Sequence, residues 1–381
     1  MIRRQKKGLS IIVNIARIIV GILFIFSGLV KANDPSGLSY KMQEFFDVWA
    51  QNESLSGLMH WLDDFALPFS IIMITLEIVV GVALLLGWKS KFISWLLLLL
   101  IIFFTFLTGY AVLSGKIRTC GCFGDCIPLT AMQSFIKDLV LFVLIVILVI
   151  GSSLITPLLK GSRTIILILI SMILVLFFQG YVLRYMPIKD CLPFKKGNNI
   201  ISLRKMPSDA IPDMMDFIFV YQKGGKIREF SKDRLPDSTW TFVKRQDIVL
   251  QKGKNNEPPI KDFFLNTLSG SDTTEALLSQ TGKYYLFFIK NIHGHVEDWF
   301  TNFSKLYTTS KEKGERIYII TTQPEQANEF FNDKNKFGVQ ILSLDATALK
   351  TASRTDPSIY LMNGPIVENK WGWAEFKNIV K

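Results

Sequence analysis

The stretch "IIVNIARIIVGILFIFSGLV" (residues 11–30) is a long apolar segment that contains few polar residues. An α-helix needs about 20 mostly apolar residues to cross the hydrocarbon core of a bilayer. Four further segments of similar length and composition follow it, at residues 67–88, 92–112, 139–159 and 164–186. The sequence therefore predicts an α-helical membrane bundle with five spans.

The composition agrees with a membrane protein. Of the 381 residues, 49% are apolar and 20% are charged, and the charged share lies below the roughly 25% of typical soluble domains. The net charge is +11, but part of it lies in basic clusters beside the apolar segments. Because no basic stripe is interleaved with aromatic residues, we expect membrane lipid and no nucleic acid among the partners.

Basic residues beside the spans predict how the chain is oriented. "RRQKK" (residues 3–7) precedes the first span, Lys89 and Lys91 separate the second from the third, and Lys160 and Arg163 separate the fourth from the fifth. The first span is too long for a secretory signal and no small-x-small cleavage site follows it, so we expect it to stay attached. Since Lys and Arg concentrate on the cytoplasmic side, the sequence predicts a multi-pass inner-membrane protein with a cytoplasmic amino terminus and a periplasmic carboxy-terminal domain.

The stretch "RTCGCFGDC" (residues 118–126) holds Cys120, Cys122 and Cys126, and Cys191 follows the last span. All four cysteines fall on the predicted periplasmic side, where disulfides form and persist. A zinc or iron–sulfur site of four thiolates is disfavoured by the tight C-x-C spacing, so we expect no metal. Two alternatives stay open: structural disulfides, or a pair that exchanges with a partner thiol or a quinone.

Two ionisable residues lie inside predicted spans, Arg17 in the first and Glu77 in the second. Charged residues inside a membrane usually face the bundle interior and pair with one another. Arg17 lies roughly 9 Å and Glu77 roughly 16 Å from the cytoplasmic end of their helices, at 1.5 Å per residue. We therefore predict an intramembrane ion pair between them, with a proton-coupled or quinone-coupled role as the alternative.

Outside the spans, the pattern changes from segment to segment. Apolar residues at helical spacing predict an amphipathic helix over residues 36–51. Gly224 and Gly225 separate two strand-like runs in "DFIFVYQKGGKIREF" (residues 216–230), which indicates a hairpin. A strand–helix–strand pattern begins at residue 283. We therefore divide the chain into four parts: 1–160, a four-helix membrane domain; 161–199, the fifth span and a linker; 200–256, a small β-rich segment; and 257–381, an α/β domain.

The membrane part resembles a known family. "ARIIVGILFIFSGLVKANDP" (residues 16–35) and "LEIVVGVALLLGW" (residues 76–88) are similar to the first two helices of DoxX-type membrane proteins, and "CGCFG" (residues 120–124) resembles the related MauE branch. That branch belongs to methylamine utilisation and is implicated in forming disulfides of a periplasmic partner. The resemblance covers about residues 10–155. It implies a four-helix domain with thiol or quinone redox chemistry, in which Cys120 and Cys122 are the redox residues.

This chain departs from that pattern in several ways. It adds Cys126, Cys191, a fifth span and a large carboxy-terminal domain, and nothing in the sequence indicates methylamine as a substrate. The resemblance therefore implies the chemistry more strongly than the substrate.

The carboxy-terminal domain resembles a thioredoxin fold in its order of elements. "RTDPSIYLMNGPIVENKWGW" (residues 354–373) is similar to the segment that closes that fold, with Pro357 at the position of a cis proline. The active-site C-x-x-C is missing, because "KNIHGHVEDW" (residues 290–299) stands in its place. His293 and His295 occupy this position and form an incomplete metal site, so we expect an exposed loop. The domain is then a docking module for another protein, or a clamp over the cysteine loop.

These observations favour a membrane protein of thiol–disulfide chemistry on the periplasmic face, which as an enzyme would be a thiol–disulfide oxidoreductase. Cys120 and Cys122 exchange with a periplasmic thiol protein, Cys126 and Cys191 relay electrons or form a structural bridge, and a quinone is the expected cofactor. The alternative is a non-catalytic assembly or maturation factor whose cysteines are structural. A transporter is disfavoured, because no pair of spans is broken by polar residues, Gly or Pro.

Overall fold

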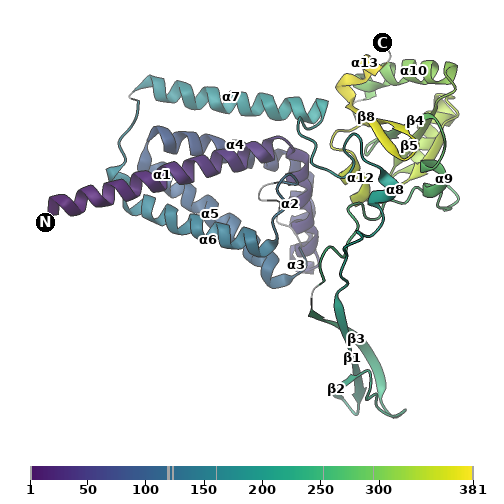
Figure 1. Ribbon diagram of the computed structural model, residues 1–381, viewed down its shortest axis with the longest axis horizontal. Helices are drawn as coiled ribbons and strands as arrows, with labels where there is room; N and C mark the ends of the chain where they lie inside the picture. Colours follow the sequence, from purple (N-terminus) through teal and green to yellow (C-terminus); the bar gives the residue numbers. More distant parts are fainter. Residues whose placement is uncertain are drawn as a thin grey trace.

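The computed structural model describes residues 2–117, 121, 124–159, 161–251, 253–294 and 296–379. A helical bundle is followed by a mixed α/β domain at one end of the bundle, and a narrow β-sheet projects away from both (Figure 1).

Within the described residues, five helices are long and apolar enough to cross a membrane. They are α1 (Ile2–Ala32), α4 (Ala66–Leu86), α5 (Ser90–Ser114), α6 (Ala131–Ile150) and α7 (Ser162–Tyr185). Helix α1 packs along α4, α5 packs along α6, and α7 lies against α4 on the outside of the bundle (Figure 1). The chain is thus a multi-pass membrane protein, and the prediction of five spans is confirmed.

The close packing of α1 on α4 depends on glycine. A Cβ atom at Gly81 would lie 2.9 Å from Cγ1 of Ile25 and 3.0 Å from the carbonyl oxygen of Gly21. Small residues at such crossings let two helix backbones approach closely inside a membrane. The α1–α4 pair is therefore the tight seam of the bundle.

The fourth span begins and ends earlier than the sequence predicted. Thr130 and Gln133 form a reciprocal capping box that starts α6 at Ala131. The helix ends before Gly151, and a short 3-10 turn, η1 (Ser152–Leu154), follows. The predicted span over residues 139–159 is therefore wrong by about two helical turns, because the apolar run continues past the end of the helix.

Two amphipathic helices, α2 (Pro35–Ala50) and α3 (Glu53–Asp64), cover one end of the bundle, which we call the capped end. Pro35 opens α2, and the Asp34 side chain accepts a hydrogen bond from the Gly37 amide at 2.9 Å. The apolar face of α2 is buried, as Met42 and Phe45 show. This confirms the amphipathic helix predicted over residues 36–51.

In the described part of the α/β domain, five strands form one sheet in the order β6-β5-β4-β7-β8. The strands are β4 (Lys283–Phe288), β5 (Arg316–Thr321), β6 (Gln340–Ser343), β7 (Ser358–Asn363) and β8 (Ile366–Gly372). β4, β5 and β6 are parallel, whereas β7 is antiparallel to both of its neighbours. The peptide bond before Pro357 is cis, as the resemblance of residues 354–373 implied.

Helices cover both faces of this sheet. One core contains residues of α10 (Val296–Glu312), α11 (Pro324–Asn328), the π-helix η2 (Glu329–Lys334) and α13 (Phe376–Ile379). The other contains residues of α8 (Ile200–Leu203), α9 (Thr274–Leu278) and α12 (Ala346–Ala352). The 3-10 turn η3 (Trp373–Glu375) lies between β8 and α13. The sheet is therefore buried on both sides, which explains the nearly continuous apolar runs of its parallel strands.

A separate sheet forms the projecting arm in Figure 1. Its described strands are β1 (Met214–Lys223), β2 (Lys226–Ser231) and β3 (Thr241–Gln251), in the order β2-β1-β3. Gly224 and Gly225 join β1 to β2 with φ angles of 55° and 76°, a conformation that glycine adopts without strain. The predicted hairpin is therefore confirmed.

Candidate functional site

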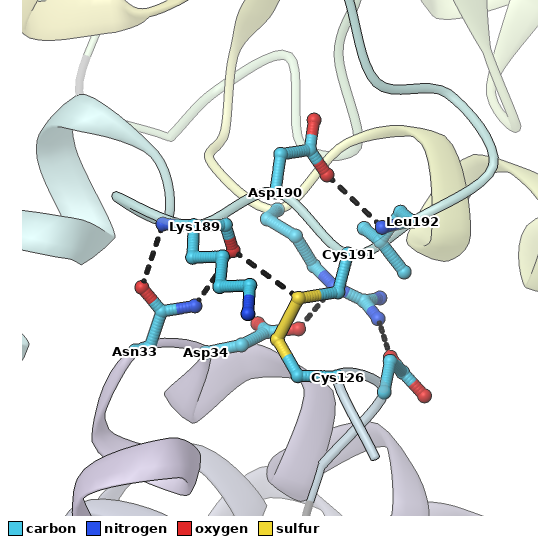
Figure 2. The surroundings of a disulfide bond; sticks show 9 residues. Asn33, Asp34, Cys126, Lys189, Asp190, Cys191 and Leu192 are labelled. Atoms are coloured by element: carbon cyan, nitrogen blue, oxygen red, sulfur yellow. Dashed lines mark hydrogen bonds and ion pairs between the residues drawn. A yellow bond between two sulfur atoms is a disulfide. The ribbon is translucent and has the colours of Figure 1, made fainter. Parts of the chain in front are cut away.

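A disulfide ties the cysteine loop after α5 to the linker after α7. Cys126 and Cys191 are bonded, with their Cα atoms 4.9 Å apart. Figure 2 shows the linker held beside this bond: the Asn33 side chain donates to the Lys189 carbonyl at 2.8 Å and accepts from the Lys189 amide at 3.1 Å. Of the two roles that the sequence left open for this pair, a bridge is present. Cys120 and Cys122, the predicted redox residues, lie outside the described residues.

Arg354 connects the α/β domain to the capped end and to the cysteine loop. Its Nε donates to Asp34 at 2.8 Å, and its Nη2 donates to Asp125, the residue before Cys126, at 2.6 Å. Its Nη1 donates to the carbonyl oxygen of Lys350 at 2.7 Å, and the side chain is buried. Burial disfavours the charged form, but the two carboxylates outweigh it and raise the pKa of Arg354 above its ordinary value. The guanidinium therefore stays charged and joins the α/β domain to Asp34 and Asp125.

Tyr40 of α2 lies among three cations of the α/β domain. The Lys290 ammonium donates to the Tyr40 hydroxyl at 2.8 Å. Lys290, Lys350 and Arg354 each lie 5.4 to 5.5 Å from the centre of the Tyr40 ring, within the range of cation–π attraction. The Ser36 hydroxyl also donates to the carbonyl of Arg354 at 3.0 Å. Helix α2 is thus the surface on which the α/β domain is docked.

The loop after β4, where the thioredoxin resemblance places the missing cysteines, begins at this same interface. The Asp356 carboxylate accepts from the backbone amides of Lys290 and Asn291 at 2.7 and 3.0 Å. His293 lies in the turn that follows, and His295 lies outside the described residues. Among the residues that the structure describes, no three His, Cys, Asp or Glu side chains are placed to hold a metal ion.

Glu77 pairs with Lys31 inside the bundle. Its Oε1 lies 2.5 Å from the Lys31 ammonium, and its Oε2 accepts from the Ser27 hydroxyl at 3.3 Å. Both charged side chains are almost fully buried, at 2% exposure for Glu77 and 4% for Lys31. The predicted ion pair between Arg17 and Glu77 is therefore wrong, because Lys31 at the end of α1 pairs with the Glu77 carboxylate.

Arg17 instead binds backbone carbonyls far from the capped end. Its Nε donates to Leu84 at 2.9 Å and its Nη2 to Leu85 at 2.5 Å, at the carboxy-terminal end of α4. Its Nη1 donates to Thr156, in the segment after α6, at 3.1 Å. The last carbonyls of a helix have no partners within the helix. Arg17 provides partners for two of them and joins the end of α4 to the segment after α6.

A small cavity of about 30 Å³, lined by both charged and apolar side chains, lies within the bundle beside the Lys31–Glu77 pair. Asp138 of α6 also lines it, accepting from the Thr108 hydroxyl at 3.1 Å and pairing with Lys137 at 2.6 Å. Neither Lys31 nor Asp138 was predicted from the sequence as a site residue. An acidic residue within an apolar helix is a signal for such a site, but the displaced prediction for the fourth span left Asp138 just outside it.

Comparison with known families supports the membrane part of this description. Residues 9–151 match the family model described as Methylamine utilisation protein MauE. Residues 215–252, which include most of the projecting arm, match a family described as Domain of unknown function (DUF8463). No curated protein and no solved structure matches the chain. The predicted resemblance to the MauE branch is therefore confirmed for the membrane domain.

Proposed function

We propose that this protein is a membrane thiol–disulfide redox protein, in which Cys120 and Cys122 form the exchanging pair on the periplasmic face. One observation carries the proposal. The Cys126–Cys191 bond and the Arg354–Asp125 contact fix one end of the cysteine loop, and they leave Cys120 and Cys122 as the remaining cysteines of the chain. The similarity of residues 9–151 to the MauE family supports the same chemistry.

A thiolate of the periplasmic partner attacks the Cys120–Cys122 disulfide, forms a mixed disulfide and releases one cysteine of the pair as a thiolate. A second partner thiolate then displaces the other cysteine, so the partner leaves with a disulfide and the pair is left reduced. A membrane quinone supplies the oxidising equivalent, since re-forming the Cys120–Cys122 bond releases two electrons and two protons.

The α/β domain serves as the clamp over the loop. We assign it to the thioredoxin fold, because the parallel unit β4-α10-β5 is followed by the antiparallel pair β7-β8 beside β4. Residues 257–381 contain no cysteine, so the domain supplies contacts while the membrane domain supplies the thiols. Its contacts with α2, beside the cysteine loop, support these separate roles for the two domains.

A second function is favoured by a separate observation. The arm carries apolar side chains that are largely exposed, among them Ile227, Phe242 and Leu250, at 63%, 53% and 60%. Exposed apolar clusters often mark surfaces that bind other proteins. We therefore retain a non-catalytic assembly or maturation factor as the alternative, with the arm as the client-binding part.

Thiol trapping in intact membranes separates the two functions. The parent chain and the variants Cys120→Ser, Cys122→Ser, Cys126→Ser and Cys191→Ser are treated with a mass-tagging maleimide before and after mild dithiothreitol. For a redox protein, two sulfurs become reactive at low dithiothreitol and are protected again once it is removed, and Cys120→Ser and Cys122→Ser each abolish this cycle.

The two variants of the bridge are the matched controls, because the cycle should persist in both. If all four sulfurs react only after denaturation, the cysteines are structural and the assembly factor is the better description.

A further inference from the structure

A large apolar chamber lies between α2, α3, α4 and α5 at the capped end. Its volume is about 420 Å³, which falls within the range of about 300 to 1,000 Å³ of small-molecule sites in proteins. Aromatic side chains dominate its described lining: Phe45, Trp49, Trp61, Phe65, Phe69 and Phe103. None of the described residues that line it is charged. The chamber therefore suits a flat, apolar ligand.

One side of the chamber faces the lipid. Trp61, Phe69 and Ile72 line it and are 58%, 38% and 61% exposed on the surface of the bundle. At its inner end, Met42 and Phe45 are only 6% and 4% exposed. In a bilayer, such a mouth admits molecules that are dissolved in the hydrocarbon core.

The inner end adjoins a pocket that reaches the cysteine loop. Three residues line both spaces: Met42, Phe45 and Leu107. The pocket is also lined by Lys31, Lys41 and Gly121, and Gly121 stands between Cys120 and Cys122 in the sequence. The inner end of the chamber therefore lies beside a space that is lined by two lysine side chains and by a residue of the cysteine loop.

The charges at the inner end favour a neutral ligand head. The Lys31 ammonium is paired with Glu77 at 2.5 Å, and the Lys41 ammonium is paired with Glu44 at 2.7 Å. A negatively charged phosphate head group would therefore meet lysines whose charge is already neutralised by a neighbouring carboxylate. An ammonium carries three N–H donors, so each lysine can still donate to a carbonyl oxygen while it keeps its carboxylate partner.

We propose that this chamber binds a membrane quinone, with the ring among the aromatic side chains and a carbonyl oxygen toward Lys31 and Lys41. The role of the bound quinone rests on the proposed function, in which it reoxidises the cysteine pair. Oxidation of the Cys120 and Cys122 thiols to a disulfide releases two electrons and two protons, and reduction of the quinone to the quinol consumes them. Binding itself depends only on the chamber and can be measured without turnover.

The test uses the full chain in lipid nanodiscs and a decyl-substituted benzoquinone with a photoreactive azido group. The expected result is saturable labelling of peptides from α2 and α5, suppressed by the unlabelled decylbenzoquinone. Leu107→Trp fills the junction between the chamber and the lysine pocket and should reduce the apparent affinity more than tenfold. Lys41→Met removes one hydrogen-bond donor and should reduce it about fivefold.

Two variants keep the test independent of folding. Leu113→Trp places the same large side chain on the same helix at a position that is 89% exposed, and it should label like the parent. Ile72→Trp adds bulk at the mouth without changing the core, and it should weaken labelling even if Leu107→Trp is poorly folded. Labelling that is not saturable, or that none of the chamber variants changes, means that the chamber holds only lipid chains, and the inference is then wrong.

The double variant Cys120→Ser/Cys122→Ser separates this inference from the proposed function. It should bind the azidoquinone like the parent. If the quinone binds but the cysteine pair does not cycle, the chamber stands and the redox function fails. If the pair cycles without saturable labelling, the redox function stands and the chamber assignment fails.

Discussion

Arg354 in the α/β domain and Asp125 in the cysteine loop lie 2.6 Å apart, although 229 residues separate them in sequence. The same guanidinium holds Asp34 at the start of α2. One side chain thus fixes three parts of the chain: the α/β domain, the capped end and the residue next to Cys126. Because the two carboxylates outweigh the effect of burial and raise the pKa of Arg354, the guanidinium stays charged at physiological pH.

Replacing Arg354 by Met should release the α/β domain from the bundle. The variant leaves the Asp34 carboxylate, which is 14% exposed, without its partner, and breaking a buried pair in this way costs about 3 to 5 kcal/mol. Hydrogen exchange should rise in residues 34–44 and 350–357, the two sides of the interface.

Arg204→Met is the matched control, because Arg204 pairs with Glu275, which is 65% exposed, within the α/β domain. Such surface pairs contribute about 1 kcal/mol or less. Equal exchange at the interface in both variants would mean that Arg354 does not hold the domains together.

Loss of the Cys126–Cys191 bond should destabilise the protein without undocking the α/β domain. The bond joins positions 65 residues apart, for which loop-closure entropy gives a stabilisation of roughly 4 kcal/mol. Cys126→Ser, Cys191→Ser and the double variant should therefore lower the thermal midpoint by the same amount. A double variant that is less stable than either single variant would mean that each cysteine contributes outside the bond.

Much of the fold could be predicted because its signals are local. The spans, helix α2 and the hairpin at Gly224 and Gly225 each follow from apolar spacing or from the residues of one turn. The end of the fourth span could not be predicted from hydropathy, since residues 152–159 remain largely apolar after the helix ends at Gly151. At the start of the same span, the capping box at Thr130 was a better signal than hydropathy.

The contacts of the candidate site were harder to predict, because they join distant parts of the chain. Glu77 was given the wrong partner because depth in the membrane was the sole criterion, and Lys31 was treated as part of a helix-end motif. Nothing near Arg354 in the sequence indicates that it binds Asp34 and Asp125. By contrast, four cysteines allow three pairings, so the Cys126–Cys191 bond was among the few possible outcomes.

Removing either partner of the Lys31–Glu77 pair should destabilise the membrane domain more than removing both. Lys31→Met leaves a buried carboxylate, and Glu77→Leu leaves a buried ammonium, so each single variant should lose about 3 to 5 kcal/mol. The double variant should recover much of this loss, because two apolar side chains of similar volume then fill the space. Thermal unfolding in detergent measures the cycle, and additive losses would show that the two side chains are not coupled.

Arg17 should hold the end of α4 against the segment after α6 through its hydrogen bonds. A positive charge at this position without the same hydrogen bonds should hold the two segments together less well. Arg17→Leu removes donors to Leu84, Leu85 and Thr156, and each hydrogen bond from a charged group contributes about 1.5 to 3 kcal/mol. Arg17→Lys keeps the charge but cannot reproduce the planar fork of the guanidinium, so it should recover only part of the loss. Hydrogen exchange of residues 152–157 reports the effect directly.

Asn14→Leu on the same helix is the control, since Asn14 donates to Ser10 within α1, and it should leave that exchange unchanged. If Arg17→Lys behaves like the parent, the interaction is electrostatic and the three carbonyl contacts are incidental.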